Sequence, residues 1–295
     1  MTDLTNLETF VAAVQSGSFA AAARRLGVSP AMVGRRIQAL EERHGARLIE
    51  RTTRAQRLTE VGESFLAQAE IVLEAMAELE ELTRGEPGRL RGRIRMSGPT
   101  TLGITRLAPI LARYCDANPD VTVEMALSDR RIDLVAEGFD LAVRVGELQP
   151  SGLVARRVGT YRFVACAAPA YVAAHGEPKS PDELRQHRCI LNLNLTPRNQ
   201  WPFIGPAGDS ITALVGGGLQ IDNGEAQRAA TLGGAGIAYL PIDLVARDIA
   251  EGMIVPLLGG WRTITLPIHT LHPTRHLVPR RVAALIETVA AGLQP

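Results

Sequence analysis

The chain has 295 residues, of which 46% are hydrophobic and 21% charged, a composition typical of a globular protein with two or three domains. Its formal net charge is only +1, and its few aromatic residues (4%) argue against binding of single-stranded nucleic acid by stacking. Three widely separated cysteines (Cys115, Cys166, Cys189) predict buried thiols rather than disulfides or a metal site. With no predicted signal peptide and no run long enough to cross a bilayer, we expect a cytoplasmic protein.

Residues 3–16 have the period of an amphipathic helix, with five apolar side chains on one face. These are Leu4, Leu7, Phe10, Val11 and Val14. We expect this helix to support the next two from behind.

Residues 18–44 predict two helices joined by a sharp turn. Ser18 is placed to cap the first helix, which Gly27 ends, and Ser29 is placed to cap the second, with Pro30 at its first position. The apolar side chains of the second helix fall on one face, at Val33, Ile37 and Leu40. The tight link fits a helix-turn-helix.

The opposite face of the second helix carries small or long polar side chains, which suits entry into a DNA major groove. We predict base contacts from Pro30, Ala31, Arg35 and Gln38, a backbone contact from Ser29, and further DNA contacts from Gly34 and Arg36. The alternative is an αα-hairpin on the surface with solvated arginines. Between Arg24 and Arg57, nine arginines stand against three glutamates, a local net charge of +6 on a nearly neutral chain, which favours phosphate binding.

Two short strands are predicted behind these helices, at 47–49 and 56–58, joined by Glu50 to Ala55. A hairpin here makes the fold a winged helix. Its tip is predicted to meet the DNA backbone or minor groove through Arg51, Thr52, Thr53 and Arg54. The alternative is an ordinary exposed hairpin.

Residues 60–83 predict one long helix with an apolar seam at heptad spacing. One series is Leu58, Phe65, Val72 and Leu79, and the other is Val61, Gln68, Ala75 and Leu82. Seven glutamates and no basic residue between Glu60 and Glu81 exclude this helix from DNA contact. The seam needs a partner, either a second helix of this kind or the helix's own chain.

The first 60 or so residues resemble the LysR-type transcriptional regulators. The resemblance rests on Phe10-Val11, Gly17-Ser18-Phe19, Ala21-Ala22-Ala23, Leu26-Gly27-Val28-Ser29, Ile37-Gln38-Ala39-Leu40-Glu41, Arg47-Leu48-Ile49-Glu50-Arg51 and Leu58-Thr59-Glu60-Val61-Gly62. It implies an antiparallel dimer of linker helices, dimers of dimers, and an inverted-repeat operator on double-stranded DNA, with RNA polymerase a further candidate partner. One position departs from the pattern, because Gly34 stands where the family usually has Ser or Thr.

Gly85 to Gly88 predict a hinge, after which strands and helices alternate, as in an α/β domain with a largely parallel sheet. The predicted elements are a strand at 93–97, a loop at 98–103 opening a helix to about Asn118, a strand at 121–127, a short helix at 132–137 and a strand at 140–145.

This region resembles the family's effector-binding domain, through residues 133–146, Pro181-Asp182-Glu183-Leu184 with His187, and Gly234-Ala235-Gly236-Ile237-Ala238 with Leu240-Pro241. The resemblance implies an α/β domain of two lobes, similar to type 2 periplasmic binding proteins, with a ligand cleft between them. We expect a winged helix-turn-helix at 1–60, a linker helix and hinge at 61–90, and an effector domain at 91–295. Lobe I would comprise 91–162 and 267–295, and lobe II 163–266. The chain should cross between lobes near 162–165 and 265–269, and Arg280–Leu293 should be the last helix.

Ligands of open α/β sheets lie beyond the carboxyl ends of strands and at helix N-termini. That rule selects Thr100, Thr101, Ser128, Asp129, Arg144 and Asn223, and analogy with the family adds Asn192 and Asn194. The two threonines could instead be helix caps, and Arg144 could bridge to Asp140 or Asp133. We expect a small polar or anionic effector.

An enzyme is the rival class, but no nucleophile elbow, Walker A loop or zinc-binding His-Glu-x-x-His helix is present. Pro273 interrupts the nearby histidines His269, His272 and His276, so we predict no metal site and no cofactor. The Gly-rich run at 233–236 lacks dinucleotide-binding spacing. A transporter's solute-binding protein is excluded by the DNA-binding head.

Overall fold

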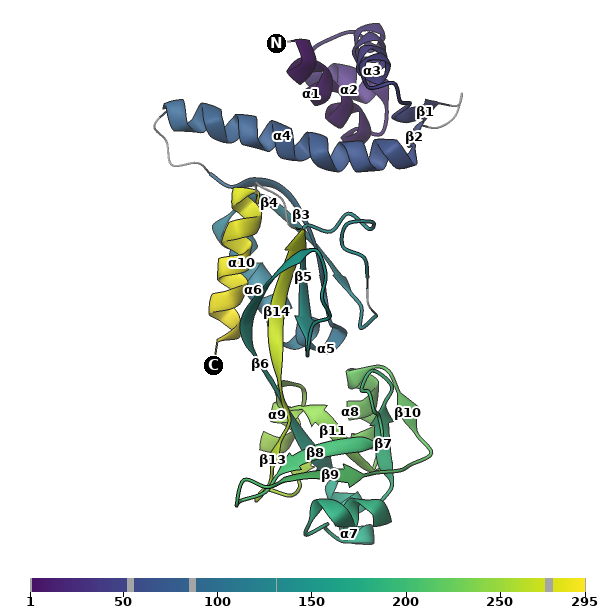
Figure 1. Ribbon diagram of the computed structural model, residues 1–295, viewed down its shortest axis with the longest axis vertical. Helices are drawn as coiled ribbons and strands as arrows, with labels where there is room; N and C mark the ends of the chain where they lie inside the picture. The colour runs from purple at the N-terminus through teal and green to yellow at the C-terminus, as the bar shows by residue number, and fades with distance from the viewer. Residues whose placement is uncertain (1, 52–55, 85–88, 131, 274–277, 295) are drawn as a thin grey trace. The chain divides into compact units, whose positions relative to one another are not determined.

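The structure, a computed structural model, describes residues 2–51, 56–84, 89–130, 132–273 and 278–294 (Figure 1). The chain divides into two compact units, Met1–Leu90 and Arg91–Pro295.

The first unit is helical, with one small hairpin. Its elements are α1 (Thr2–Gln15), α2 (Phe19–Leu26), α3 (Pro30–His44), β1 (Ile49–Arg51), β2 (Gln56–Leu58) and α4 (Glu60–Arg84). Both predicted caps are confirmed: Ser18 Oγ accepts a hydrogen bond from the Ala21 N–H, and Ser29 Oγ from the Met32 N–H. Gly27 ends α2 at φ 66°, a left-handed conformation that glycine adopts without strain. The helix-turn-helix is thus built as its sequence predicts.

The core of this unit packs α1, α2, α3 and one face of α4 together. Its fully buried side chains include Phe10, Val33 and Leu48, and the Phe10 and Phe65 rings meet edge to face with centroids 5.5 Å apart. Phe65, one of the predicted seam residues, therefore packs within its own unit. Three apolar seam residues are exposed on α4, namely Val61, Val72 and Leu79, and the seam residue Gln68 is exposed as well.

The first wing strand begins two residues later than predicted, at Ile49 instead of Arg47. The reason is a side chain: Glu41 Oε1 of α3 accepts hydrogen bonds from the N–H groups of Leu48 (2.7 Å) and Ile49 (3.1 Å). These N–H groups are satisfied by a carboxylate, so strand pairing starts only at Ile49, opposite Leu58. Glu41 thereby fixes where the wing leaves the reading helix.

The second unit is built on a nine-stranded sheet whose path is β10-β7-β11-β6-β14-β5-β3-β4, with β12 also paired to β6. Lobe I contains β3 (Arg91–Gly98), α5 (Thr100–Leu102), the π-helical turn η1 (Gly103–Leu107), α6 (Ala108–Ala117), β4 (Asp120–Leu127), β5 (Leu141–Val145) and α10 (Arg280–Leu293). Two strands, β6 (Leu153–Ala167) and β14 (Thr265–Pro273), are long, and β6 continues from lobe I into lobe II, as expected (Figure 1).

Lobe II carries the remaining elements. They are α7 (Pro169–His175), the 3₁₀ turn η2 (Pro181–Gln186), β7 (Cys189–Asn192), β8 (Gln200–Ile204), β9 (Ser210–Leu214), β10 (Gln220–Ile221), α8 (Gly224–Leu232), β11 (Ile237–Pro241), α9 (Ile242–Ala250), β12 (Val255–Pro256) and β13 (Arg262–Thr263). β13, β8 and β9 form a separate antiparallel sheet. Its Trp201 stacks on Tyr239 of β11, which joins it to the main sheet.

Two expectations for this unit are wrong. The sheet is mixed, because β14 runs antiparallel to both β5 and β6, whereas β3, β4 and β5 are parallel as expected. The helix expected at 132–137 is a turn: the Asp133 carboxylate accepts from the N–H groups of Val135 and Ala136, and Gly138 at φ 67° stops any further helical turn.

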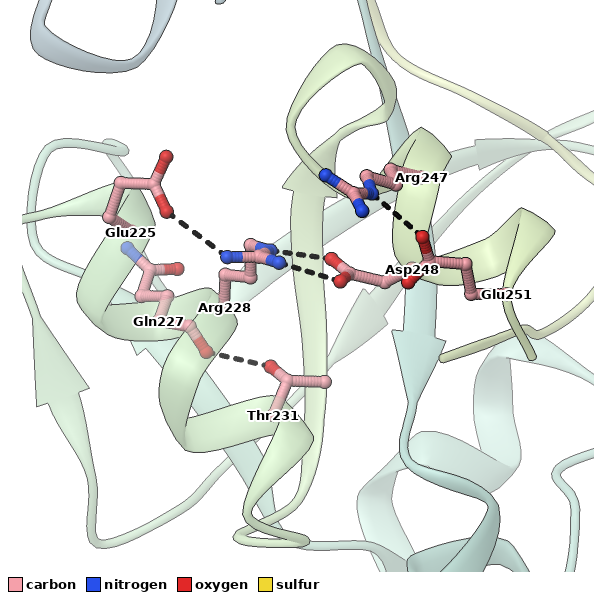
Figure 2. A network of polar contacts seen from close by, with 7 residues as sticks. All are labelled: Glu225, Gln227, Arg228, Thr231, Arg247, Asp248 and Glu251. Carbon is pink, nitrogen blue, oxygen red and sulfur yellow. Dashed lines mark hydrogen bonds and ion pairs between the residues drawn. The ribbon is translucent and has the colours of Figure 1, made fainter. Parts of the chain in front are cut away.

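α8 and α9 of lobe II are joined by an ion pair between a half-buried arginine and a buried aspartate (Figure 2). Asp248 is fully buried, and its two oxygens accept from Nε and Nη2 of Arg228 at 2.5 and 2.6 Å. Arg228 also contacts Glu225 one turn earlier, and this carboxylate pair raises the pKa of Arg228. The bidentate geometry fixes the orientation of α8.

Replacing Asp248 with Asn should lower the free energy of unfolding by about 3 kcal/mol, because a buried charge-assisted pair loses one partner. Arg247→Ala is the matched control, since Arg247 and Glu251 form an exposed pair on the same helix and should change stability little. Urea denaturation followed by circular dichroism measures both. Equal effects of the two variants would contradict a structural role for the buried pair.

Gly62 allows α4 to pass close to the wing, since a Cβ there would lie 2.0 Å from the Leu48 carbonyl oxygen. Gly62→Ala should therefore destabilise the first unit by about 2 kcal/mol through overpacking. Gly34→Ala is the control, because its Cβ would meet the Phe19 ring at an ordinary 3.8 Å; it should stabilise by about 0.5 kcal/mol through the better helix propensity of alanine. The same denaturation experiment compares them.

Candidate DNA-binding surface and effector site

The predicted DNA-reading face of α3 is open to solvent. Ser29, Pro30, Ala31, Arg35 and Gln38 are exposed, whereas the opposite face is buried in the core of the first unit. Gly34 lies between them, half-buried beside Phe19. Within the described residues of the first unit, α3 thus presents Arg35, Gln38 and small residues on a face that is open to solvent.

Three of the predicted contact residues have partners in the protein: Ser29, whose Oγ caps α3, and the side chains of Arg36 and Gln38. Arg36 is half-buried, and its Nη1 donates to Thr9 Oγ1 of α1 at 3.2 Å, so this side chain turns toward the core side of the helix. Gln38 Nε2 donates to Glu42 Oε1, one turn along, at 2.8 Å. One Nε2 hydrogen of Gln38 is thus engaged, which leaves its second N–H and its carbonyl oxygen for a base, while Arg36 is placed for packing as much as for DNA.

The wing tip is only partly described. Arg51 ends β1, opposite Gln56. The predicted contacts Thr52, Thr53 and Arg54 lie outside the described residues.

In lobe I, the predicted effector residues gather where β3, β4 and β5 end. The Thr100 N–H donates to Asp129 Oδ1 at 3.0 Å, so the protein's own carboxylate caps the N-terminus of α5. Ser128 Oγ accepts from the Arg130 N–H at 3.2 Å. An incoming anion would therefore meet a position already held by a negative charge.

Arg144 does not bridge to Asp140 or Asp133, which was the alternative interpretation. Its Nη2 donates to Ser97 Oγ at 3.0 Å and its Nη1 to the Val143 carbonyl oxygen at 2.8 Å. Burial lowers the pKa of Arg144, and the charges of Asp129 and Glu137 act in the opposite direction. The guanidinium is thus half-buried with neutral hydrogen-bond partners.

In lobe II, the three predicted asparagines come together at the ends of β7 and β10. Asn223 Oδ1 caps α8 by accepting from the Ala226 N–H at 3.0 Å. Asn192 Oδ1 accepts from the Asn194 N–H at 2.9 Å, and Asn194 Nδ2 donates to the Asp222 carbonyl oxygen. These bonds hold the two loops side by side.

The two groups face each other where the lobes meet. α5 and α8 approach so closely that a Cβ on Gly224 would lie 2.3 Å from Thr101 Oγ1. Nearby, Arg106 of η1 forms an ion pair with Asp243 of α9 at 3.2 Å. The site therefore draws on both lobes, as expected of an effector site.

Sequence reasoning missed Arg106, Asp243 and Tyr161 at this junction. Asp243 could have been found, because it lies in the first turn of a helix that directly follows a strand. Tyr161 has no local signal; its place depends on the crossing of β6 between the lobes.

Two of the three cysteines are buried. Burial raises the pKa of the Cys166 and Cys189 thiols to about 12, so both are protonated at neutral pH. Over the described ranges, no three His, Cys, Asp or Glu side chains cluster as metal ligands. A search of the same residues finds no helix able to span a membrane.

Comparison with known families agrees with this architecture. Residues 4–63 match the family model described as "Bacterial regulatory helix-turn-helix protein, lysR family", and residues 87–294 match the "LysR substrate binding domain". The chain belongs to the LysR-type transcriptional regulators. It is a DNA-binding regulator with an effector-binding domain, and not an enzyme.

Individual relatives cover the chain from end to end. PtxR of Pseudomonas aeruginosa, an HTH-type transcriptional regulator, is 35% identical over 99% of this chain and 93% of its own. A regulator of Xanthomonas campestris pv. campestris is 34% identical over 99% of this chain and 86% of its own.

Solved structures extend the similarity to the fold. CrgA of Neisseria meningitidis, a LysR-type regulator, is 31% identical with a TM-score of 0.63, covering 98% of each chain. Full-length AphB, the Vibrio cholerae virulence activator, is 28% identical with a TM-score of 0.61, covering 98% of this chain and 99% of its own.

Arg35→Ala should lower affinity for the preferred DNA site by about 1–3 kcal/mol and relax the preference at one base pair. Selection of binding sites from random-sequence DNA, done with both proteins, measures this. Arg36→Ala is the comparison, because loss of its bond to Thr9 should act mainly on stability. Uniformly weaker binding of Arg35→Ala to every sequence would instead make Arg35 a phosphate contact.

Proposed function

We propose that this regulator reads an inverted-repeat operator with two copies of α3, one from each protomer of a dimer. The observation that carries this proposal is the open face of α3, which begins at Ser29, displays Arg35 and lies within a segment of local net charge +6. A recognition helix of this kind reads one half-site, so two-fold symmetry requires two half-sites in inverted orientation.

The division of roles follows the sequence. Residues 1–60 read DNA, 61–90 pair protomers, and 91–295 sense the effector. Base contacts come from Pro30, Ala31, Arg35 and Gln38. The DNA backbone is held by Ser29, with Arg51, Thr53 and Arg54 of the wing.

Pairing of protomers rests on α4. Val61, Val72 and Leu79 are exposed on this helix after its other face has packed into its own unit. An antiparallel pair of α4 helices would bury them. Dimers then associate into tetramers, by analogy with the family, and RNA polymerase is a further partner at promoters. Chromosomal DNA as ligand places the protein in the cytoplasm.

The effector, in this proposal, is a small polar or anionic molecule at the junction of the lobes. Thr100, Thr101, Ser128, Asp129 and Arg144 would line it from lobe I. Asn192, Asn194 and Asn223 would line it from lobe II. Binding changes how the lobes close, and this change is coupled to how dimers pair on and bend DNA.

Selection of genomic fragments by the purified protein, followed by footprinting at two salt concentrations, tests this function. We expect protection of an inverted repeat, with affinity that falls steeply as salt rises because phosphate contacts release counterions. Enrichment of no fragment over random DNA would overturn the assignment of residues 1–60 to sequence-specific reading.

A further inference from the structure

One face of the main sheet carries a row of basic side chains across three strands. In the ladders, His269 of β14 lies directly opposite Arg144 of β5 on one side and directly opposite Arg157 of β6 on the other. Residues that pair directly across an antiparallel ladder project from the same face, with Cβ atoms about 4.5–5.5 Å apart. Three basic residues are thus direct neighbours on adjacent strands.

The row lies on the face of the sheet that α10 does not cover. Arg156, the residue before Arg157 on β6, forms an ion pair with Glu287 of α10. Because successive side chains of a strand alternate between the two faces, Arg157 projects away from α10. Arg157 is exposed, whereas Arg144 and His269 are half-buried. The row is therefore open to solvent at its Arg157 end.

Within the described residues, no carboxylate forms an ion pair with this row. The side chains of Arg157 and His269 have no hydrogen bond there, and Nδ1 of His269 is buried without a partner. Arg144 donates to two neutral oxygens, those of the Ser97 hydroxyl and the Val143 carbonyl. Like charges that lie directly opposite each other in a ladder are destabilising, so the row needs a counter-charge.

A further arginine continues the basic face along the same ladder. Arg162 of β6 lies opposite Thr265 of β14, is exposed, and has no ion pair in the described part of the chain. Two carboxylates, Asp129 and Glu137, act on the charge of Arg144 at longer range without forming an ion pair with it. The face therefore keeps an excess of positive charge.

Other arginines of the same unit do have a carboxylate partner. Arg106 pairs with Asp243 at 3.2 Å, and Arg228 holds Asp248 through two hydrogen bonds. The row differs from them in lacking the acid. An oxyanion with two or more negative charges supplies what is missing, because a guanidinium binds two oxygens of a carboxylate or phosphate through parallel N–H donors.

We propose that the row formed by Arg144, His269 and Arg157 binds a small molecule that carries two or more negative charges, in phosphoryl or carboxylate groups. The anion neutralises both arginines, and the imidazole lies between them. This inference rests on the proposed function, because Arg144 belongs to the proposed effector site. It adds the charge of the effector and assigns His269 and Arg157 as ligand-binding residues.

Thermal unfolding of the full-length protein tests the ligand class. The probes are inorganic phosphate, at a pH where it is a dianion, and succinate, with acetate and chloride as monovalent controls at equal ionic strength. We expect phosphate or succinate to raise the melting temperature more than either control does. A larger effect of phosphate indicates a phosphoryl ligand, and a larger effect of succinate a dicarboxylate. No advantage of either dianion over the controls overturns the proposal.

Arg157→Gln and Arg156→Gln are the matched variants that locate the site, since these neighbours project from opposite faces of β6. Calorimetric titration with the stabilising dianion should show about tenfold weaker binding to Arg157→Gln, because a charge-assisted hydrogen bond is lost. Its ligand-free melting temperature should stay equal or rise, since a like-charge neighbour is removed.

Arg156→Gln should keep the affinity for the dianion and melt slightly earlier, because it loses the ion pair with Glu287. Phosphate that binds the basic segment 24–57, or that acts through the solvent, affects both variants alike, so the difference between them reports on the row. Equal affinity of the two variants overturns the assignment of the site.

His269→Leu tests the middle of the row. The variant removes a ring nitrogen that has no partner, so the ligand-free protein should melt at the same or a higher temperature, while the dianion binds more weakly. Unchanged affinity overturns the role of His269.

The two levels of proposal fail separately. Absence of dianion binding, with a footprinted operator in hand, overturns the anion site alone. Failure of operator selection overturns the proposed reading of DNA, and the titrations of the variants still decide the anion site.

Discussion

The long ladder between β6 and β14 is the constraint on which the second unit depends. These strands pair antiparallel from Thr265–Arg162 to Pro273–Leu153, with one register shift between Ile268 and His269. Beyond this ladder, β6 goes on to pair with β11 and β12 of lobe II. On the lobe I side, Gly159 lets α10 approach so closely that a Cβ there would lie 2.7 Å from the Leu293 carbonyl oxygen. Both lobes are therefore attached to one pair of strands, and Tyr161 lies on that pair where the lobes meet.

The junction beside this ladder is held by the protein's own polar groups before any ligand arrives. Asp129 caps α5 and Asn223 caps α8, so one N–H group at each of the two helix N-termini that meet there is already bonded within the protein. Arg106 and Asp243 join the lobes directly. The Tyr161 hydroxyl on β6, by contrast, is buried without a hydrogen-bond partner among the described residues. The Arg106–Asp243 ion pair crosses the junction, so a change in the spacing of the lobes would change the distance between its two charges. An effector that binds at the junction would in this way be coupled to the geometry of the lobes.

Most of the fold can be predicted from the sequence, because the helix caps, the glycines and the spacing of apolar residues agree with the packing of the folded chain. Caps, glycines and heptads place α1 to α4 within a residue or two, and the last helix, Arg280–Leu293, is predicted with its observed bounds. The errors come from side-chain hydrogen bonds to the backbone, which helix and strand periodicity does not reveal. β1 starts late because Glu41, seven residues before Leu48, satisfies its N–H groups. The turn at 133–138 replaces a helix because the Asp133 side chain competes for the backbone. Of the candidate site, strand-end residues are predictable, whereas Tyr161 and Arg106 depend on contacts across more than 80 residues of sequence.

Charge is segregated along the chain, and this segregation separates the tasks of the first unit. The basic stretch from Arg24 to Arg57 is followed at once by a helix with seven glutamates and no cation before Arg84. The acidity of α4 repels phosphate, so α3 and the wing are left as the surfaces that DNA can approach. Pairing with a second α4 helix would remove the exposed Val61, Val72 and Leu79 from water. Because both helices would be acidic, the favoured arrangement is one in which the apolar stripes meet and the glutamates point outward. If protomers pair through α4 as proposed, the sign of the charge on adjacent helices keeps recognition of DNA apart from recognition of a second protomer.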